Sequence, residues 1–316
     1  MTADAALSPP RARSAAGRTA RGAALVSVAL LAVNGLSYVF TVLAARTLVP
    51  QAYGELAALL GVLLIGAVPG TGLQTAAALR LAGAADRGLA GLHGAALATS
   101  AAVTLVGVLA AGPVMALLHL PGPAPVCWLV VVLFPQTLVG GYTGLLQGTG
   151  RYVRLALVTA VFGLAKAGGG TAGLLLGGTS AAALAGMATG SLLAALLAWA
   201  LCGRPAVGRD VGAPVRATLR ASGALLGLVV LVNLDLLLAR HHLPPAQAGE
   251  YAVGAVFAKV AFWLPQGIAV VVLPALGDPR TRARALPVAL ALVGGSGAVL
   301  TAGTARIGRA SCRERV

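Results

Sequence analysis

The chain has 316 residues, of which 58% are apolar and only 10% are charged, and its mean hydropathy is +0.91. Soluble domains carry about a quarter charged residues, so this composition excludes a soluble protein and indicates an all-α polytopic membrane protein. The net charge of +15 would suggest a nucleic-acid partner in a soluble protein. Here it predicts membrane topology instead, and we expect no nucleic acid as a partner.

Apolar segments of about 20 residues, long enough to cross a membrane as helices, recur along the chain. Residues 1–21 precede the first of them, are polar and basic, and are predicted to be disordered. The nine predicted spans are Gly22–Ala45, Leu56–Leu79, Ala95–Leu118, Val126–Leu146, Leu155–Leu176, Ala181–Leu201, Ser222–Ala239, Ala252–Leu276 and Leu286–Ala305.

Arginine is distributed unevenly over the segments that connect these spans. The N-terminal segment and every second loop are rich in arginine, whereas the intervening loops hold only Arg46 and Arg240. Positively charged loops stay in the cytoplasm, so we predict a multi-pass protein of the cytoplasmic membrane with a cytoplasmic N terminus. The arginines predicted to be cytoplasmic are Arg11, Arg13, Arg18, Arg21, Arg80, Arg87, Arg151, Arg154, Arg204, Arg209, Arg216, Arg220, Arg280, Arg282 and Arg284.

Two predicted outer loops share a pattern that indicates an internal repeat. Residues 43–55 and 237–251 both contain Ala-Arg, then Leu, then Pro, and then Gly, Tyr and Glu close together. Six helices separate them, as in transporters built from two similar bundles; coincidence in an Ala/Leu-rich chain is the alternative. A repeat predicts a first six-helix lobe at 22–202, a cytoplasmic linker at 203–221 and three helices of a second lobe at 222–305. About nine of twelve or more helices would then be present.

The last ten residues, Ile307–Val316 (IGRASCRERV), match the in-frame translation of a common short-read sequencing adapter. A genuine basic cytoplasmic tail is the alternative. On the adapter interpretation, residues 306–316 are artefactual, Cys312 does not belong to the natural protein, and the natural chain continues past about Ala305. Such segments are excluded from fold reasoning.

Several short motifs in a fixed order resemble one family of membrane transporters. The family is the oligosaccharide (polysaccharide) flippases of the multidrug/oligosaccharidyl-lipid/polysaccharide (MOP) exporter superfamily, and the resemblance covers roughly residues 22–305. The motifs are Arg46–Leu56, Gly72-Leu73-Gln74-Thr75, Leu146–Tyr152, Asn233-Leu234-Asp235, Gly249-Glu250-Tyr251 and Leu264-Pro265.

The resemblance implies a two-lobed helical transporter whose central cavity alternates between the two membrane faces. It implies a secondary transporter whose substrate is a polyprenyl-pyrophosphate-linked oligosaccharide, flipped to the outer leaflet for cell-surface polysaccharide biosynthesis. The partners it implies are this lipid-linked substrate, the membrane lipids and a coupling proton or sodium ion.

Lys166 lies in the middle of the fifth predicted span. Ionisable residues within spans are rare and costly, and they usually face a cavity or a partner. We expect Lys166 to attract the pyrophosphate or another anionic headgroup of the substrate. The alternative is a lysine that snorkels or bonds to backbone carbonyls.

Asp235 and Lys259 lie in the outer halves of the seventh and eighth predicted spans. Because these spans are neighbours in sequence, the two side chains could form an ion pair. The pair is either a fixed structural feature or a proton- or sodium-linked switch, since burial and a nearby cation act on a carboxyl group in opposite directions.

Arg46 and Arg240 occupy equivalent places in the repeat and could line the outer mouth of a cavity, where they would bind substrate. Anchoring of helix ends at the membrane interface is the alternative. Gln74 could bind sugar hydroxyls or form a hydrogen bond between helices. The same two roles are open to Asn34, Gln147 and Asn233.

The remaining function classes are less consistent with the sequence. A cation-coupled multidrug exporter and a peptidoglycan-precursor flippase belong to the same superfamily and stay open as alternatives. A membrane-embedded glycosyltransferase or polymerase would need carboxylates to activate its substrates, and the chain has only eight acidic residues. We find no P-loop, CxxC pair or His/Cys cluster, so we expect no catalytic residues, metal or cofactor.

Overall fold

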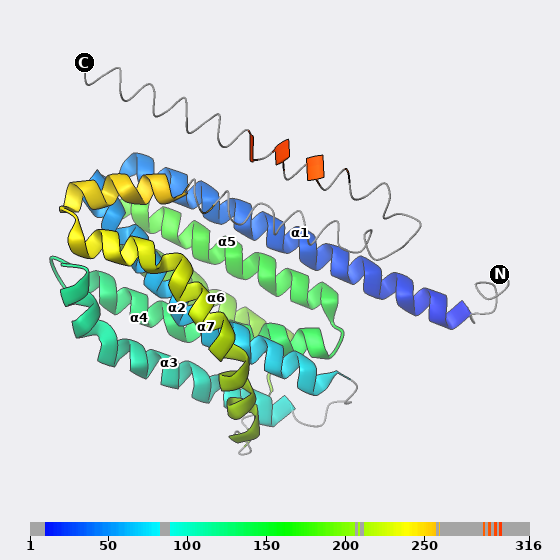
Figure 1. The fold of residues 1–316 in the computed structure, drawn as a ribbon. Coiled ribbons are helices and arrows are strands. Elements are labelled where there is room, and N and C mark those ends of the chain that lie inside the picture. Colours follow the sequence, from blue (N-terminus) through cyan, green and yellow to red (C-terminus); the bar gives the residue numbers. More distant parts are fainter. Residues whose placement is uncertain are drawn as a thin grey trace. The chain divides into compact units, whose positions relative to one another are not determined.

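The computed structural model of the chain describes residues 10–82, 89–205, 208, 212–256 and 259, together with isolated positions between 287 and 298. The described residues form long helices and contain no strand (Figure 1). The helices are α1 (Pro10–Thr47), α2 (Pro50–Leu81), α3 (Leu89–Leu117), α4 (Ala124–Gly148), α5 (Tyr152–Gly177), α6 (Ser180–Leu201) and α7 (Gly212–His242). A further helical segment covers residues 245–256.

The chain divides into two compact units, Met1–Gly249 and Glu250–Val316. The first unit contains α1 to α7, and all seven are long and apolar enough to cross a membrane. The first seven predicted spans are therefore confirmed as helices. The eighth predicted span begins in the helical segment at 245–256, and most of the eighth and ninth lies outside the described residues.

Two helices start earlier than the apolar pattern indicates. α1 begins at Pro10, within the segment predicted to be disordered, and α7 begins at Gly212, within the predicted linker. Both extensions are rich in alanine and arginine, which have high helix propensity. An apolar window finds the part of a helix that crosses the hydrocarbon layer, and it does not find the polar turns that continue beyond it.

α4 is at the centre of the first unit, where it packs against α2, α3 and α6 (Figure 1). Its buried Tyr142 and Leu146 form a core cluster with Leu73 of α2 and Ala198 of α6. α1 packs on α5, and α7 lies across α2. Many large apolar side chains on the outer faces are exposed, as on α3. A helix bundle in lipid exposes such residues because lipid tails are as apolar as leucine.

Small residues bring α5 and α6 into backbone contact. A Cβ atom added at Gly186 would lie 1.9 Å from the carbonyl oxygen of Gly169, and one added at Gly173 would lie 2.0 Å from that of Ala182. No side chain fits in these positions. Close approach through glycine and alanine is how membrane helices gain packing energy where no hydrophobic driving force exists between them.

Candidate functional site

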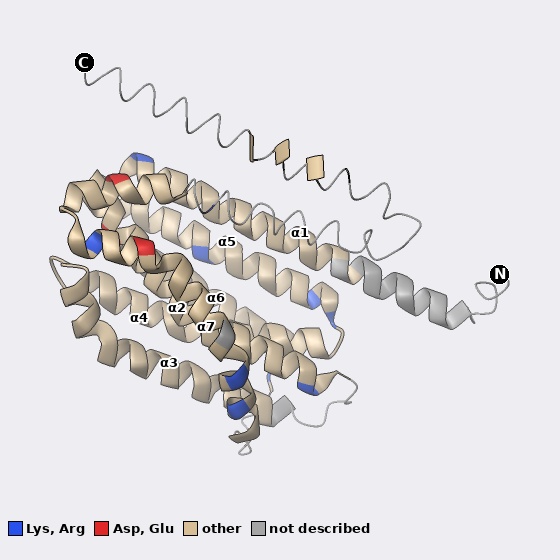
Figure 2. Cartoon of the chain, in the orientation of Figure 1, with Lys and Arg blue, Asp and Glu red and all other residues tan. Residues whose placement is uncertain are grey.

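The charged side chains gather at two opposite ends of the bundle (Figure 2). One end holds the C terminus of α2 and the N termini of α5 and α7, and we call it the arginine-rich end. Its described members are Arg80, Arg151, Arg154, Arg204, Arg216 and Arg220. The opposite end, the mixed-charge end, carries Arg46, Glu55, Asp235 and Arg240. This division follows the alternation of arginine over the loops.

Lys166 lies between the two ends, near the middle of α5. Its side chain is partly buried, and its Nζ donates a hydrogen bond of 2.5 Å to Oε1 of Gln136 on α4. The amine also lies 5.9 Å from the centre of the Phe162 ring. An amide oxygen and an aromatic face attract a cation, but neither carries a compensating negative charge. Lys166 therefore keeps its capacity to attract an anion.

Gln136 was not singled out in the sequence, although a signal was present. It lies in the middle of α4, and Lys166 lies in the middle of α5. Successive spans run in opposite directions, so residues at their midpoints share one depth in the membrane. A polar residue at the midpoint of one span is a natural partner for a charge at the midpoint of the next.

Glu55 and Arg240 lie buried at the mixed-charge end. Glu55 on α2 is 7% exposed and accepts a hydrogen bond from Oγ of Ser180 at the start of α6. Arg240 on α7 is 4% exposed and interacts electrostatically with Glu55. Arg240 Nη1 is buried without a hydrogen-bond partner among the described residues. Burying two opposite charges costs desolvation free energy, and this cost is only partly offset when some of their hydrogen bonds are missing.

The last residues of α7 bind the end of α3. Arg240 donates from Nε to the carbonyl oxygen of Leu118 at 3.0 Å, and His241 Nδ1 lies 2.9 Å from that of Leu117. The His241 ring also stacks on His119, with the ring centres 5.2 Å apart. The last carbonyls of a helix lack partners within the helix. We call this set of contacts the α3–α7 clamp, which closes the mixed-charge end between the two helices.

Asp235 lies on α7 five positions before Arg240, and its Oδ1 is buried without a hydrogen-bond partner among the described residues. A buried carboxylate oxygen without a donor is costly, so a cation at this place would be favourable. Lys259 belongs to the second compact unit, and the ion pair expected between Asp235 and Lys259 stays a prediction.

The other candidate residues lie apart from Lys166. Gln74 on α2 donates from Nε2 to Oε1 of Gln147 on α4 at 3.1 Å, which is a hydrogen bond between helices. Arg46 is exposed near the end of α1, and Arg240 is buried in the clamp. The structure therefore places Arg46 and Arg240 at the mixed-charge end, away from Lys166 and Gln74, and does not bring the four residues into one cluster.

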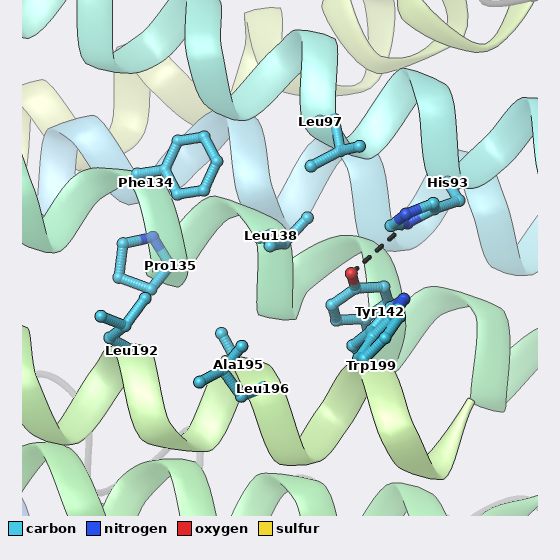
Figure 3. A pocket seen from close by; sticks show the side chains of 10 residues that line it. All are labelled: His93, Leu97, Phe134, Pro135, Leu138, Tyr142, Leu192, Ala195, Leu196 and Trp199. Carbon is cyan, nitrogen blue, oxygen red and sulfur yellow. Dashed lines mark hydrogen bonds between the residues drawn. The ribbon is translucent and has the colours of Figure 1, made fainter. Parts of the chain in front are cut away.

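A groove runs along α4 between α3 and α6, and we call it the α4 groove (Figure 3). Its volume is about 340 Å³. His93 and Tyr142 lie at one end of it, where the Tyr142 hydroxyl and His93 Nδ1 are 3.3 Å apart. The lining residues are His93, Leu97, Phe134, Pro135, Leu138, Tyr142, Leu192, Ala195, Leu196 and Trp199. Almost all of them are apolar, which favours a hydrocarbon occupant over a sugar.

Comparison with known proteins identifies the fold. No family model and no curated protein matches the sequence. Among solved structures, the chain resembles the eukaryotic MATE transporter AtDTX14 with a TM-score of 0.57 at 13% identity, over 90% of this chain and 72% of that one. A MOP superfamily transporter from Pyrococcus furiosus matches with a TM-score of 0.48 at 13% identity, over 88% and 76% of the two chains.

The protein therefore has the all-helical fold of the MATE transporter AtDTX14, and the predicted fold class is confirmed. It is a multi-pass membrane protein. Fold does not determine what a protein transports, so substrate and mechanism rest on the site residues described above.

Proposed function

We propose that the protein is a secondary transporter that flips a polyprenyl-pyrophosphate-linked oligosaccharide across the cytoplasmic membrane by alternating access. Its N terminus and its arginine-rich end face the cytoplasm, in accord with the positive-inside rule. The observation that carries the proposal is Lys166, a cation at mid-membrane depth whose contacts are a neutral amide and an aromatic ring.

The proposed role of Lys166 is to hold the phosphate end of the substrate. In the described state the amine is bound to Gln136. An incoming pyrophosphate offers several charged oxygens and competes well against one neutral amide oxygen. The sugar headgroup then crosses between the two lobes, and the polyprenyl tail stays in the bilayer. Arg46 and Gln74 lie on either side of this depth, where they contact the headgroup as it enters or leaves.

Alternating access requires that the contacts between α7 and the first six helices break and re-form. The α3–α7 clamp closes the mixed-charge end, which faces outward in the proposed orientation. Release of substrate to the outer leaflet therefore requires Arg240 and His241 to leave the carbonyls of Leu118 and Leu117. Binding of a proton or sodium ion at Asp235, with Lys259 as its partner, biases the equilibrium between the two states.

The proposal is tested by reconstituting the full-length protein in proteoliposomes and measuring the flipping of a fluorescent polyprenyl-pyrophosphate glycan. We expect Lys166→Met to lower the rate by roughly tenfold to a hundredfold, because it removes a charge-assisted bond to phosphate worth about 1.5–3 kcal/mol. Lys166→Arg should retain a substantial part of the rate, since it keeps the charge. Arg220→Ala, an exposed arginine of the cytoplasmic end, is the matched control. Equal rates for the wild type and Lys166→Met would rule out this role.

A cation-coupled multidrug exporter of the same superfamily is the second candidate, and Asp235 favours it. An unpartnered buried carboxylate oxygen suits a cationic substrate as well as a coupling ion. The flippase and the drug exporter can be told apart by which variant, Lys166→Met or Asp235→Asn, abolishes substrate binding. Loss of binding of a lipophilic cation in Asp235→Asn, with no effect of Lys166→Met, would favour drug export. Loss of substrate binding in Lys166→Met, with no effect of Asp235→Asn, would support the flippase. This result would not separate it from a peptidoglycan-precursor flippase, whose substrate shares the pyrophosphate chemistry.

A further inference from the structure

We propose that the α4 groove binds an anionic phospholipid of the cytoplasmic leaflet, with one acyl chain in the groove and the phosphate on Arg204. Among the described residues, the groove is lined by α3, α4 and α6 and not by α7. It contains neither Lys166 nor Asp235. The site is therefore distinct from the proposed substrate and coupling residues, and it rests only on the membrane orientation given under the proposed function.

The groove has the shape and lining of an acyl-chain site. Its floor extends along α4 from Phe134 to Tyr142, roughly 12 Å at 1.5 Å per residue. On one wall, Leu192 and Leu196 of α6 are 49% and 56% exposed, so the groove opens at the outer surface of the bundle. In a membrane this surface faces hydrocarbon, and an apolar cavity there takes up a lipid chain.

The polar end of the groove lies toward the arginine-rich end of the protein. His93 is near the start of α3, Tyr142 is in the last third of α4, and Trp199 is near the end of α6. Figure 3 shows His93, Tyr142 and Trp199 together at one end of the groove and Phe134 and Pro135 at the other. Tryptophan and tyrosine are enriched at the level of lipid headgroups. A lipid in the groove therefore places its headgroup at the arginine-rich end.

The backbone after α6 holds Arg204 over this end of the groove. Gly203 and Arg204 both have positive φ, 87° and 52°, and this tight turn folds the chain back over α6. The backbone N–H of Arg204 donates to the carbonyl oxygen of Trp199, and its guanidinium lies 5.9 Å from the centre of the Trp199 ring. A non-glycine residue in the left-handed region is uncommon. Here that conformation places an exposed arginine beside a groove-lining tryptophan.

Charge complementarity identifies the occupant as anionic. Arg154 donates to the carbonyl oxygen of Leu201, which brings a second guanidinium to the end of α6, three residues before Arg204 in the chain. Arginine binds phosphate in a bidentate geometry and stacks on aromatic rings at the same time. Anionic lipids are concentrated in the cytoplasmic leaflet and attract basic clusters at this depth. A zwitterionic lipid would bring its own positive headgroup close to Arg154 and Arg204.

The test compares two lipids with identical acyl chains on the purified 316-residue chain in detergent. Phosphatidylglycerol should bind more tightly than phosphatidylcholine by native mass spectrometry and should raise the Tm further. Arg204→Ala should weaken phosphatidylglycerol binding by roughly tenfold, as expected for loss of a charge-assisted bond. Arg220→Ala removes an exposed arginine on α7 at the same end and should leave binding unchanged.

A second variant tests the groove itself. Ala195→Phe places a ring in the groove and should abolish the preference for phosphatidylglycerol even where the Tm of the lipid-free protein falls. The proposal is overturned if both lipids bind equally, or if Arg204→Ala and Arg220→Ala behave alike. It is also overturned if polyprenyl phosphate, and not phosphatidylglycerol, binds through Arg204, because the groove would then belong to substrate recognition.

Discussion

The α5–α6 and α2–α7 interfaces are built in different ways. α5 and α6 touch backbone to backbone, with Gly169 against Gly186 and Gly173 against Ala182. At the middle of the α2–α7 interface, a Cβ added at Gly61 would lie 3.6 Å from Oδ1 of Asn233, which is ordinary contact. The first interface has no room to move. The α2–α7 interface is close at Gly72, where an added Cβ would lie 2.1 Å from Oγ of Ser222 and 2.9 Å from the carbonyl oxygen of Thr218, and it is looser at Gly61. At the mixed-charge end, α7 is also held by the polar clamp on α3.

This difference would suit the two tasks of the alternating-access transporter proposed above. Packed interfaces have discrete arrangements and do not deform continuously, so a lobe that moves as a body needs contacts like those of α5 and α6. A contact that must open in each cycle needs bonds that water or ions can replace. Arg240 and His241 bind backbone carbonyls, and these bonds can be exchanged for water when the mixed-charge end opens.

The largest effect is expected from breaking the α5–α6 interface. Gly186→Leu should abolish the folded protein, because the added Cβ would lie 1.9 Å from the carbonyl oxygen of Gly169 and backbone cannot yield as a side chain can. Overpacking commonly costs about 1–3 kcal/mol and sometimes more. Gly35→Leu on α1, where nothing lies within 4 Å, is the control. Size-exclusion profiles and Tm in detergent measure the difference, and a monodisperse Gly186→Leu protein would contradict the interface.

An intermediate effect is expected from Arg240→Ala at the clamp. The variant removes the bond to Leu118 and the electrostatic interaction with Glu55, and we expect a loss of about 1.5 kcal/mol, as for a hydrogen bond to a charged group. The mixed-charge end should open more often. A cysteine at Leu118, which is 0% exposed, should then react with a membrane-impermeant maleimide roughly tenfold faster.

The clamp experiment needs two controls. The native cysteines are first replaced, so that only Leu118→Cys is labelled. His242→Ala removes an exposed histidine that touches His241 by its edge but makes no described bond to α3, and it should leave labelling unchanged. Faster labelling in both variants would mean that the end of α7 frays as a whole and that Arg240 has no special role.

The sequence predicted the spans well because their signal is local. About 20 apolar residues need no tertiary information to be recognised, and the seven described helices match. The burial of Glu55 and Arg240 was harder to predict. The predicted spans begin one residue after Glu55, at Leu56, and end one residue before Arg240, at Ala239. α2 starts at Pro50 and α7 continues to His242, so both charges lie within helices and are buried.

Residue partners are the part of the structure for which the sequence offered candidates but no contacts. Lys166 stood out as a charge in mid-span, yet Gln136 as its acceptor depends on how α4 and α5 are packed. The glycines present the same problem. The chain has 43 of them, and only the structure separates Gly186, which touches backbone, from Gly35, which faces open space.

The smallest effect is expected from Gln74→Ala. This variant tests whether the α2–α4 contact is a fixed interface like that of α5 and α6, or one that changes during transport. Gln74 and Gln147 form one hydrogen bond between helices, and such bonds contribute about 0.6 kcal/mol in membrane proteins. We expect a small loss of stability, the same loss in Gln147→Ala, and no further loss in the double variant. Unfolding in a denaturing detergent, followed by circular dichroism, measures this double-mutant cycle. If Gln74→Ala slows flipping while Gln147→Ala does not, Gln74 contacts the sugar, because loss of a shared structural bond would affect both variants equally.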